Sequence, residues 1–350
     1  MKVTILANLE AGKSEPDVVV GQVAESLEAR GDKVTMVATY DDVEHLVREL
    51  KAAKTDLVFN LFESYGNEVI GGQMGVTGLL DLLQLPYTGV GPGEMYLQED
   101  KALAKKLLAY EQILYPDFAI FAPNAEFETG GKLRMPLFVK PLRMDASIGI
   151  DEKSLVRNTQ ELMERVLKIH KELGDAALAE EYIEGREIYV GVLGNQEPIV
   201  FPPIEMDFSG MPDGSLKVMD SKAKFDKSSD RYQGTKPVVA DLEPELKARL
   251  QKVALDAYRA LRVRDYGRMD MRLTESGEIY VIEVNASCYL EKQGEFVMAA
   301  DAHGIGYNEL IGRIADLAIE RWKHRTGVKK RRRKVAAKPA AAAKSKAAVA

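Results

Sequence analysis

The chain has 350 residues, of which 46% are hydrophobic and 29% charged, and its formal net charge at pH 7 is −6. These proportions are typical of a globular protein long enough for two or three domains. A single cysteine, Cys288, excludes an intrachain disulfide framework and predicts a reducing, cytoplasmic compartment. No apolar run approaches the length of a membrane span, so we expect none.

The first part of the chain alternates strands with helices. Strands are predicted at 2–7, 32–37, 56–61 and 87–90, and helices near 16–30, 40–53 and 71–84. This order predicts a parallel sheet covered on both faces, and ligands of such sheets bind at the carboxyl ends of the strands. Glu63 and Glu68 follow the third strand, so both are candidates for holding a substrate amine. The alternative is that these acids only cap the next helix.

A second domain is expected to begin with a helix that Asp100 caps and that runs to about Tyr110. The next apolar strand carries Lys140, and a buried lysine needs a partner such as phosphate. A lysine at a surface edge is the alternative. The following loop contains Ser147 among small residues, which let backbone N–H groups approach phosphate oxygens closely.

Two further segments lie between that loop and the C-terminal part of the chain. Residues 179–183 are predicted to form a strand and a hinge between two lobes. Residues 220–230 form a polar, lysine-bearing stretch that is long enough for a lid, and lids exclude water from reactive intermediates. The alternative for the second segment is an ordinary mobile loop.

Residues 268–285 have the pattern of a β-hairpin with a turn at Ser276–Gly277. Folding about that turn places Asp270 opposite Glu283, and Arg268 opposite Asn285, on one face of the hairpin. The other face is predicted to be core and consists of Met269, Met271, Leu273, Tyr280, Ile282 and Val284.

The polar face of this hairpin is a candidate magnesium site. Asp270, Glu283 and Asn285 provide the hard oxygen donors that Mg²⁺ prefers, while Arg268 can hold a phosphoryl group or an oxyanion. The alternative is a solvated hairpin with ordinary surface charges. Val-Ile-Glu-Val-Asn is too apolar for a surface strand, which favours a buried acid paired with an ion.

The C-terminal segment 326–350 contains nine Lys or Arg residues and no acid. Its low complexity predicts a disordered basic tail. Such an arm can hold nucleic acid or anionic lipid electrostatically. Because the rest of the chain carries an excess of acid, a solvated tail without a specific partner is favoured.

Several of these segments, taken in order, resemble the D-alanine–D-alanine ligases of the ATP-grasp superfamily. The matching blocks are Leu-Pro-Tyr-Thr-Gly at 85–89, Asp100-Lys101, Pro-Leu-Phe-Val-Lys-Pro at 136–141, Glu180 to Glu187, and Arg268-Met-Asp with Glu-Val-Asn at 283–285. The resemblance implies an α/β, ATP-grasp fold with three parts. These are an N-terminal parallel-sheet domain at 1–97, a small central α+β lobe at 98–182 and a C-terminal α+β lobe at 183–325, with ATP between the lobes.

The resemblance also implies roles for individual residues. Phosphate contacts fall to Lys101, Lys140, Ser147 and Lys224, adenine contacts to Glu180, Tyr182 and Ile183, and ribose to Glu187. For Glu187 the alternative is an exposed acid on the next strand. Asp270, Glu283 and Asn285 would bind Mg²⁺ (or Mn²⁺), with two ions expected. Arg268 would stabilise the tetrahedral intermediate, and Ser147, Glu63 and Glu68 would complete the catalytic site.

The implied activity is ATP-dependent amide formation between amino acids or peptides through an acyl phosphate, and a homodimer is compatible with it. Residues 286–295 depart from the family pattern, because Tyr289 and Glu291 intrude on a pocket built for a small amino acid. We therefore expect a changed acceptor, such as a bulkier or cationic amine facing Glu291. The alternatives are a true D-alanine–D-alanine ligase and a non-catalytic ATP-binding module whose basic tail recruits a partner.

Overall fold

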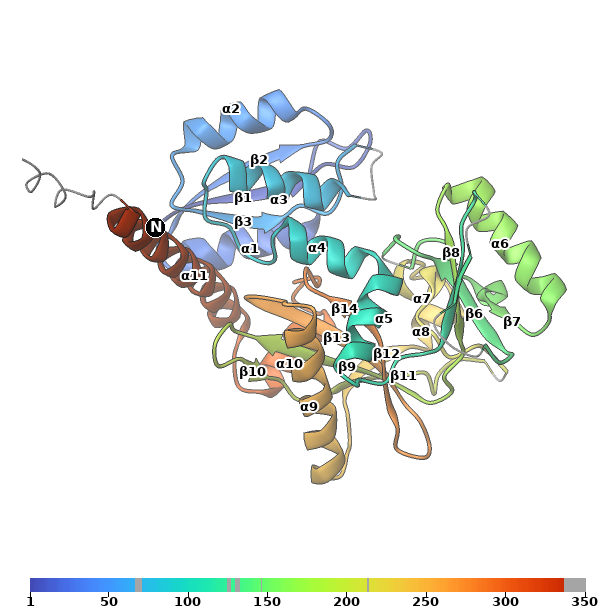
Figure 1. Ribbon diagram of the computed structural model, residues 1–350. Helices are drawn as coiled ribbons and strands as arrows, with labels where there is room; N and C mark the ends of the chain where they lie inside the picture. The colour runs from blue at the N-terminus through green and yellow to red at the C-terminus, as the bar shows by residue number, and fades with distance from the viewer. Residues whose placement is uncertain (67–70, 125–126, 130–132, 146, 213, 337–350) are drawn as a thin grey trace, which may run out of the picture.

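The computed structural model describes residues 1–66, 71–124, 127–129, 133–145, 147–212 and 214–336. Three sheets, one in each part of the chain, are arranged around a common centre (Figure 1). No helix within these described ranges is both long enough and apolar enough to cross a membrane.

The N-terminal sheet is parallel, as predicted. It has the order β2-β1-β3 and consists of β1 (Lys2–Asn8), β2 (Lys33–Thr39) and β3 (Leu57–Leu61). One face packs on α2 (Val43–Ala53) and α3 (Gly72–Leu82), and the other packs on α1 (Val18–Ala29). The fourth predicted strand, at 87–90, forms only an isolated bridge between Tyr87 and Val58.

The central lobe follows α4 (Pro92–Glu99) and α5 (Lys101–Tyr110). Asp100 caps α5 as predicted, because its carboxylate accepts from the Leu103 N–H at 2.9 Å. The sheet has the order β5-β4-β8-β6-β7, and α6 (Thr159–Leu173) covers one of its faces. Its strands are β4 (Phe118–Phe121), β5 (Phe127–Thr129), β6 (Leu137–Pro141), β7 (Leu155–Val156) and β8 (Ala177–Glu181), with a short 3₁₀ turn at Glu152–Ser154.

The C-terminal lobe contains the third sheet, with the order β12-β11-β9-β13-β14 and β10 paired to β9. Its strands are β9 (Arg186–Leu193), β10 (Ile199–Val200), β11 (Ile204–Asp207), β12 (Lys236–Val239), β13 (Tyr266–Leu273) and β14 (Ile279–Asn285). One face packs on α9 (Pro244–Ala260), and the other contacts α10 (Glu295–Ala302). The predicted lid at 220–230 is not one loop, since it contains α7 (Ser221–Phe225) and the start of α8 (Asp230–Gln233).

The predicted hairpin forms, but its register is only partly as predicted. Asp270 pairs with Glu283 and Arg268 with Asn285, whereas a bulge after Asp270 shifts the remaining pairs by one residue. Because side chains alternate at period two, this shift turns that half of β14 over. The core residues of β14 are therefore Ile279, Val281 and Val284, and the prediction that Tyr280 and Ile282 lie in the core was wrong.

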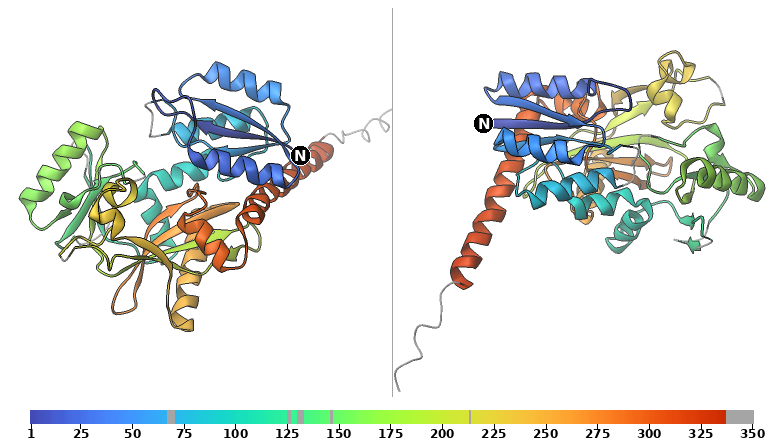
Figure 2. Two further views of the ribbon diagram at one scale, coloured as in Figure 1. Left: turned by 180° about the vertical axis from the view of Figure 1, so that it is seen from behind. Right: turned by 90° about the horizontal axis from the view of Figure 1, so that it is seen from above.

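Helix α11 (Tyr307–Ala336) continues through residues 326–336, where a disordered tail was predicted. Alanine, lysine and arginine favour helix, and the buried first half of α11 gives this basic segment a helix to extend. Residues 337–350 lie outside the described part of the chain. Helix α11 packs on α1 and β3, and its last turns project from the body (Figure 2). The division at residues 97, 182 and 325 stays a prediction.

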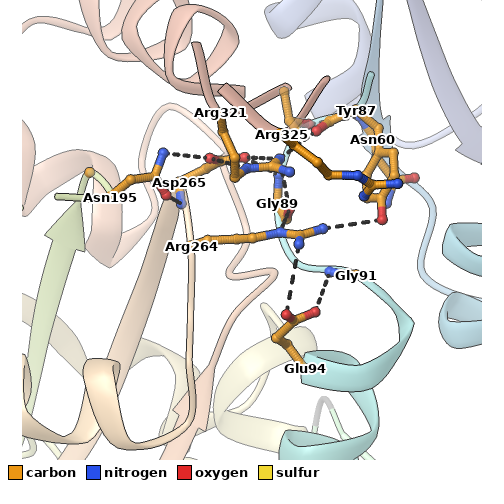
Figure 3. Close-up of polar contacts among 12 residues, drawn as sticks. Asn60, Tyr87, Gly89, Gly91, Glu94, Asn195, Arg264, Asp265, Arg321 and Arg325 are labelled. Atoms are coloured by element: carbon orange, nitrogen blue, oxygen red, sulfur yellow. Dashed lines mark hydrogen bonds and ion pairs between the residues drawn. The ribbon is translucent and has the colours of Figure 1, made fainter. Parts of the chain in front are cut away.

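A buried aspartate, Asp265, joins the N-terminal domain, the C-terminal lobe and α11 (Figure 3). Its carboxylate accepts hydrogen bonds from the Gly89 N–H at 2.9 Å and the Asn195 amide at 3.0 Å. Arg321, on α11, donates to both carboxylate oxygens, at 3.0 Å from Nε and 2.7 Å from Nη2. This junction fixes the N-terminal domain against the C-terminal lobe.

Candidate functional site

The central lobe and the C-terminal lobe enclose a cavity of about 140 Å³. All twelve residues that were predicted to bind nucleotide or metal, or to stabilise the intermediate, line it. They are Lys101, Lys140, Ser147, Glu180, Tyr182, Ile183, Glu187, Lys224, Arg268, Asp270, Glu283 and Asn285. Segments far apart in the sequence therefore meet in one place, although the role of each residue stays a prediction.

The hairpin supplies the polar floor of this cavity. Arg268 holds Asp270 through two parallel hydrogen bonds, of 2.7 Å from Nε and 2.9 Å from Nη2, and its Nη1 lies 3.0 Å from Glu295 Oε2. The guanidinium also lies over the Tyr189 ring, 4.6 Å from its centroid. The Asn285 amide donates to Asp270 Oδ2 at 3.0 Å, so the amide and the carboxylate face the same point.

The donor set on this floor fits a magnesium ion. Within the described residues no group of three His, Cys, Asp or Glu side chains could hold a metal, so Asp270 and Glu283 need additional ligands. Mg²⁺ in ATP sites takes one or two carboxylates and completes its shell with water and phosphate oxygens. Burial raises the pKa of Glu283, but Lys101, Lys140 and Lys224 outweigh it and lower that pKa to about 2. The carboxylate is therefore ionised and ready to bind a cation.

Two of the lysines predicted to contact phosphate, Lys101 and Lys140, are each paired with an acid. Lys101 Nζ lies 3.0 Å from Asp145 Oδ1 and 3.2 Å from Glu283 Oε1. Lys140 Nζ lies 2.7 Å from Glu180 Oε1, and its side chain is buried. The alternative that Lys140 is a surface-edge lysine is thus wrong, and its charge faces the cavity.

The predicted phosphate loop and the predicted lid are in contact. The Ser147 hydroxyl donates to the Met219 carbonyl at 2.8 Å, and the Ser221 hydroxyl donates to the Ser147 carbonyl at 2.7 Å. Lys224, on α7, lines the cavity from this side. Residues of both segments therefore line the same cavity as the hairpin.

Glu187 faces the cavity and is not an exposed acid. It accepts from Arg272 Nη2 at 2.7 Å and from the Tyr189 hydroxyl. The sequence interpretation missed Arg272, although a signal was present. Arg268, Asp270 and Arg272 alternate along β13, so that all three share one face.

Glu63, the first of the two acids predicted for the substrate amine, is not among the residues that line this cavity. Glu63 follows β3, and its N–H donates to Asn8 Oδ1 at 3.0 Å. Although Glu63 is exposed, neighbouring protein atoms partly desolvate its carboxyl, and this effect together with Asp17 and Asp145 raises its pKa to about 7. Glu68 lies outside the described residues.

The divergent segment 286–295 is held against α1 and the loop before it. The Tyr289 hydroxyl donates to Asp17 Oδ1 at 2.6 Å, and Glu291 accepts from the Gln293 N–H at 2.9 Å and the Gln22 amide at 3.5 Å. A carboxylate can accept more hydrogen bonds than these two, so the expected contact of Glu291 with a cationic amine stays a prediction. Cys288 is buried, and burial raises its pKa to about 12, so it is a packing residue.

Comparisons with known proteins agree with this geometry. Residues 107–316 match the family described as D-ala D-ala ligase C-terminus. The relative named Uncharacterized protein y4sG, from Sinorhizobium fredii, is 33% identical over 85% of this chain and 84% of its own length. The D-alanine--D-alanine ligase of Carboxydothermus hydrogenoformans is 30% identical over 81% of this chain and 88% of its own length.

Solved structures confirm the ATP-grasp fold that the sequence predicted. The D-alanine--D-alanine ligase from Bacillus anthracis has a TM-score of 0.73 at 25% identity. The same enzyme complexed with ATP has a TM-score of 0.71 at 23% identity. Each comparison covers 93% of this chain and 99% of the solved one.

Proposed function

The chain belongs to the D-alanine–D-alanine ligase family of ATP-grasp enzymes, and from this premise we propose that it uses ATP to join two D-amino acids, D-alanine first among them. The observation that carries the proposal is the convergence of Lys101, Lys140, Asp270 and Glu283 on one cavity between two lobes. A non-catalytic module that only binds ATP has no need of cations and metal-type carboxylates in the same place.

The cavity supports phosphoryl transfer through positioning and charge. Lys101 and Lys140 would bind phosphate oxygens, and Asp270, Glu283 and Asn285 would hold Mg²⁺, which neutralises phosphate charge when it is bound. The carboxylate of the first amino acid would take the γ-phosphoryl group, and the amine of the second would then displace phosphate. Little covalent chemistry is required of side chains in such reactions.

We propose that Arg268 acts on the second step. Its bidentate pair with Asp270 and its contact with Glu295 hold the guanidinium at the floor of the cavity. A fixed cation of this kind stabilises the oxyanion of a tetrahedral intermediate. We assign that role to Arg268 and the substrate ammonium to Glu63.

One observation favours a second candidate, a ligase with another acceptor. The Tyr289–Asp17 hydrogen bond joins the segment 286–295 to the N-terminal domain, and Tyr289 is the residue expected to intrude on a pocket built for a small amino acid. Under this alternative the acceptor is an amine other than D-alanine. The first step, transfer of the γ-phosphoryl group to the carboxylate of the donor, is unchanged.

The test is magnesium-dependent ADP release with D-alanine as the sole amino acid, followed by mass spectrometry of the product. Formation of the D-alanyl dipeptide supports the first candidate, and ADP release without it supports the second when another amine restores amide formation. Lys140→Met should abolish turnover, whereas the matched control Lys171→Met, at an exposed position on α6, should not. Absence of ADP release across a panel of amino acids would refute both.

Three further properties follow from the family and the sequence. We propose that the enzyme is cytoplasmic. We also propose that it forms a homodimer, and light scattering would test this by measuring the molar mass in solution. We also propose that the basic segment 326–350 has no specific partner. Nucleic-acid binding that weakens steeply with salt would contradict this last assignment.

A further inference from the structure

A lysine outside the cavity, Lys105, forms an ion pair with an acid that lines it. Lys101 and Lys105 lie four positions apart on α5 and therefore share one face of the helix. Lys101 lines the ATP-type cavity, whereas Lys105 lies behind it and borders a separate space of about 10 Å³. Lys105 is thus not among the residues that line the larger cavity.

The acid that pairs with Lys105 is Glu180. Its Oε2 lies 3.1 Å from Lys105 Nζ, and its Oε1 lies 2.7 Å from Lys140 Nζ. The exposed fractions of Lys105, Glu180 and Lys140 are 1%, 3% and 4%, so water does not screen these contacts. Burial raises the pKa of Glu180, but the ammoniums of Lys105 and Lys140 outweigh it and hold that pKa below its ordinary value. Glu180 is therefore ionised.

The balance of charge decides what Lys140 can do. An isolated Lys140–Glu180 pair is neutral. The buried Glu180 carboxylate would then retain the Lys140 ammonium, because the carboxylate would have no other cation as a partner. Burial lowers the pKa of Lys105, although the Glu180 carboxylate opposes this effect. When Lys105 is protonated, the three groups carry one net positive charge, and Glu180 keeps a cation when Lys140 turns to phosphate. Among the described residues, Lys105 Nζ forms an ion pair with Glu180 and no hydrogen bond, so Glu180 is the acid in direct contact with it.

We propose that Lys105 is a positioning residue, which holds Glu180 and thereby leaves the positive charge of Lys140 available to the phosphates of ATP. This inference rests on the proposed function and adds a residue to it that does not touch the nucleotide. Because Lys101 and Lys105 lie four residues apart, Lys101 reaches the cavity proposed to hold the phosphates. Lys105 lies behind Glu180, the acid that competes with phosphate for Lys140.

The experiment measures binding of a non-hydrolysable ATP analogue by calorimetry, and the KM of ATP and of the amino acid in turnover. Lys105→Met should raise the dissociation constant of the analogue by about tenfold, the lower end of the effect found when a residue that only orients a ligand-binding side chain is lost. The KM of ATP should rise equally and the KM of the amino acid should not change. Lys105→Arg should restore binding, and the exposed control Lys171→Met should match the wild type.

A double-mutant cycle separates this role from plain structural support. In a Glu180→Gln background the carboxylate is absent, so adding Lys105→Met should change ATP binding by less than about twofold. An equal loss in both backgrounds would overturn the proposal, as would a Lys105→Met variant that binds like the wild type. Lys105→Gln provides a second neutral variant if Lys105→Met does not fold. A wild-type protein that binds no ATP analogue would instead refute the proposed function.

Discussion

Replacement of Arg321 by methionine should destabilise the protein far more than the same change one helical turn later. Arg321 makes a two-point contact with Asp265, whose side chain is 0% exposed, and its Nη2 also donates to the Tyr87 carbonyl at 2.7 Å. Methionine retains the apolar stem and removes only the guanidinium. Arg325 provides the matched control, because it pairs with Asp81 and both side chains are about a third exposed, at 32% and 30%.

The magnitude follows from what remains around Asp265. Without Arg321 the buried carboxylate keeps the neutral donors of Gly89 and Asn195 but loses its two charge-assisted hydrogen bonds. Removal of one partner from a buried ion pair costs about 3–5 kcal/mol, because an uncompensated charge stays behind. An exposed pair such as Arg325–Asp81 contributes about 0–1 kcal/mol.

Urea unfolding of the wild type, Arg321→Met and Arg325→Met would measure this difference from the transition midpoints at equal slope. Arg321→Lys should fall between the wild type and Arg321→Met, since one ammonium cannot make two parallel hydrogen bonds to a carboxylate. Equal losses in Arg321→Met and Arg325→Met would show that the junction does not stabilise the fold as its burial indicates.

Three other changes address the site itself. Because the pKa of Glu63 is raised to about 7, this acid ionises as the pH rises through that value, and the KM of the amino acid should fall between about pH 6 and 8. In Glu63→Gln the KM should no longer depend on pH in this range, and an unchanged pH profile in that variant would exclude Glu63 from substrate binding. Asp270→Asn should raise the magnesium concentration for half-maximal rate by about tenfold or more, whereas an unaltered magnesium titration would remove Asp270 from the metal site. Asp145→Asn should lower the KM of ATP, because it frees Lys101 for phosphate, and a higher KM would assign Asp145 a supporting role instead.

Local spacing was enough to predict the polar face of the hairpin. Arg268, Asp270, Glu283 and Asn285 alternate with apolar residues, and alternation at period two decides which side chains share a face. The same holds for the start of α5, where Asp100 precedes an amphipathic run, and for Lys140, whose apolar neighbours predicted its burial. Each of these features depends on residues close together in the chain.

Other features depend on where distant elements meet. The bulge after Asp270 adds one residue to β14 and places Ile282 beside the cavity, an offset that periodicity does not reveal. Lys105 has the pattern of an ordinary helix lysine, and only the packing of α5 against β8 places it on Glu180.

The C-terminal helix shows the same division between local and tertiary information. Its composition indicated a basic segment, but docking of the first half of α11 on α1 and β3 set its helical course and brought Arg321 to Asp265. Sequence spacing by itself determined which residues share a face of a strand or helix, because backbone geometry sets that period. The tertiary structure decided which charges are buried together, since desolvation and pairing arise only when separate elements pack.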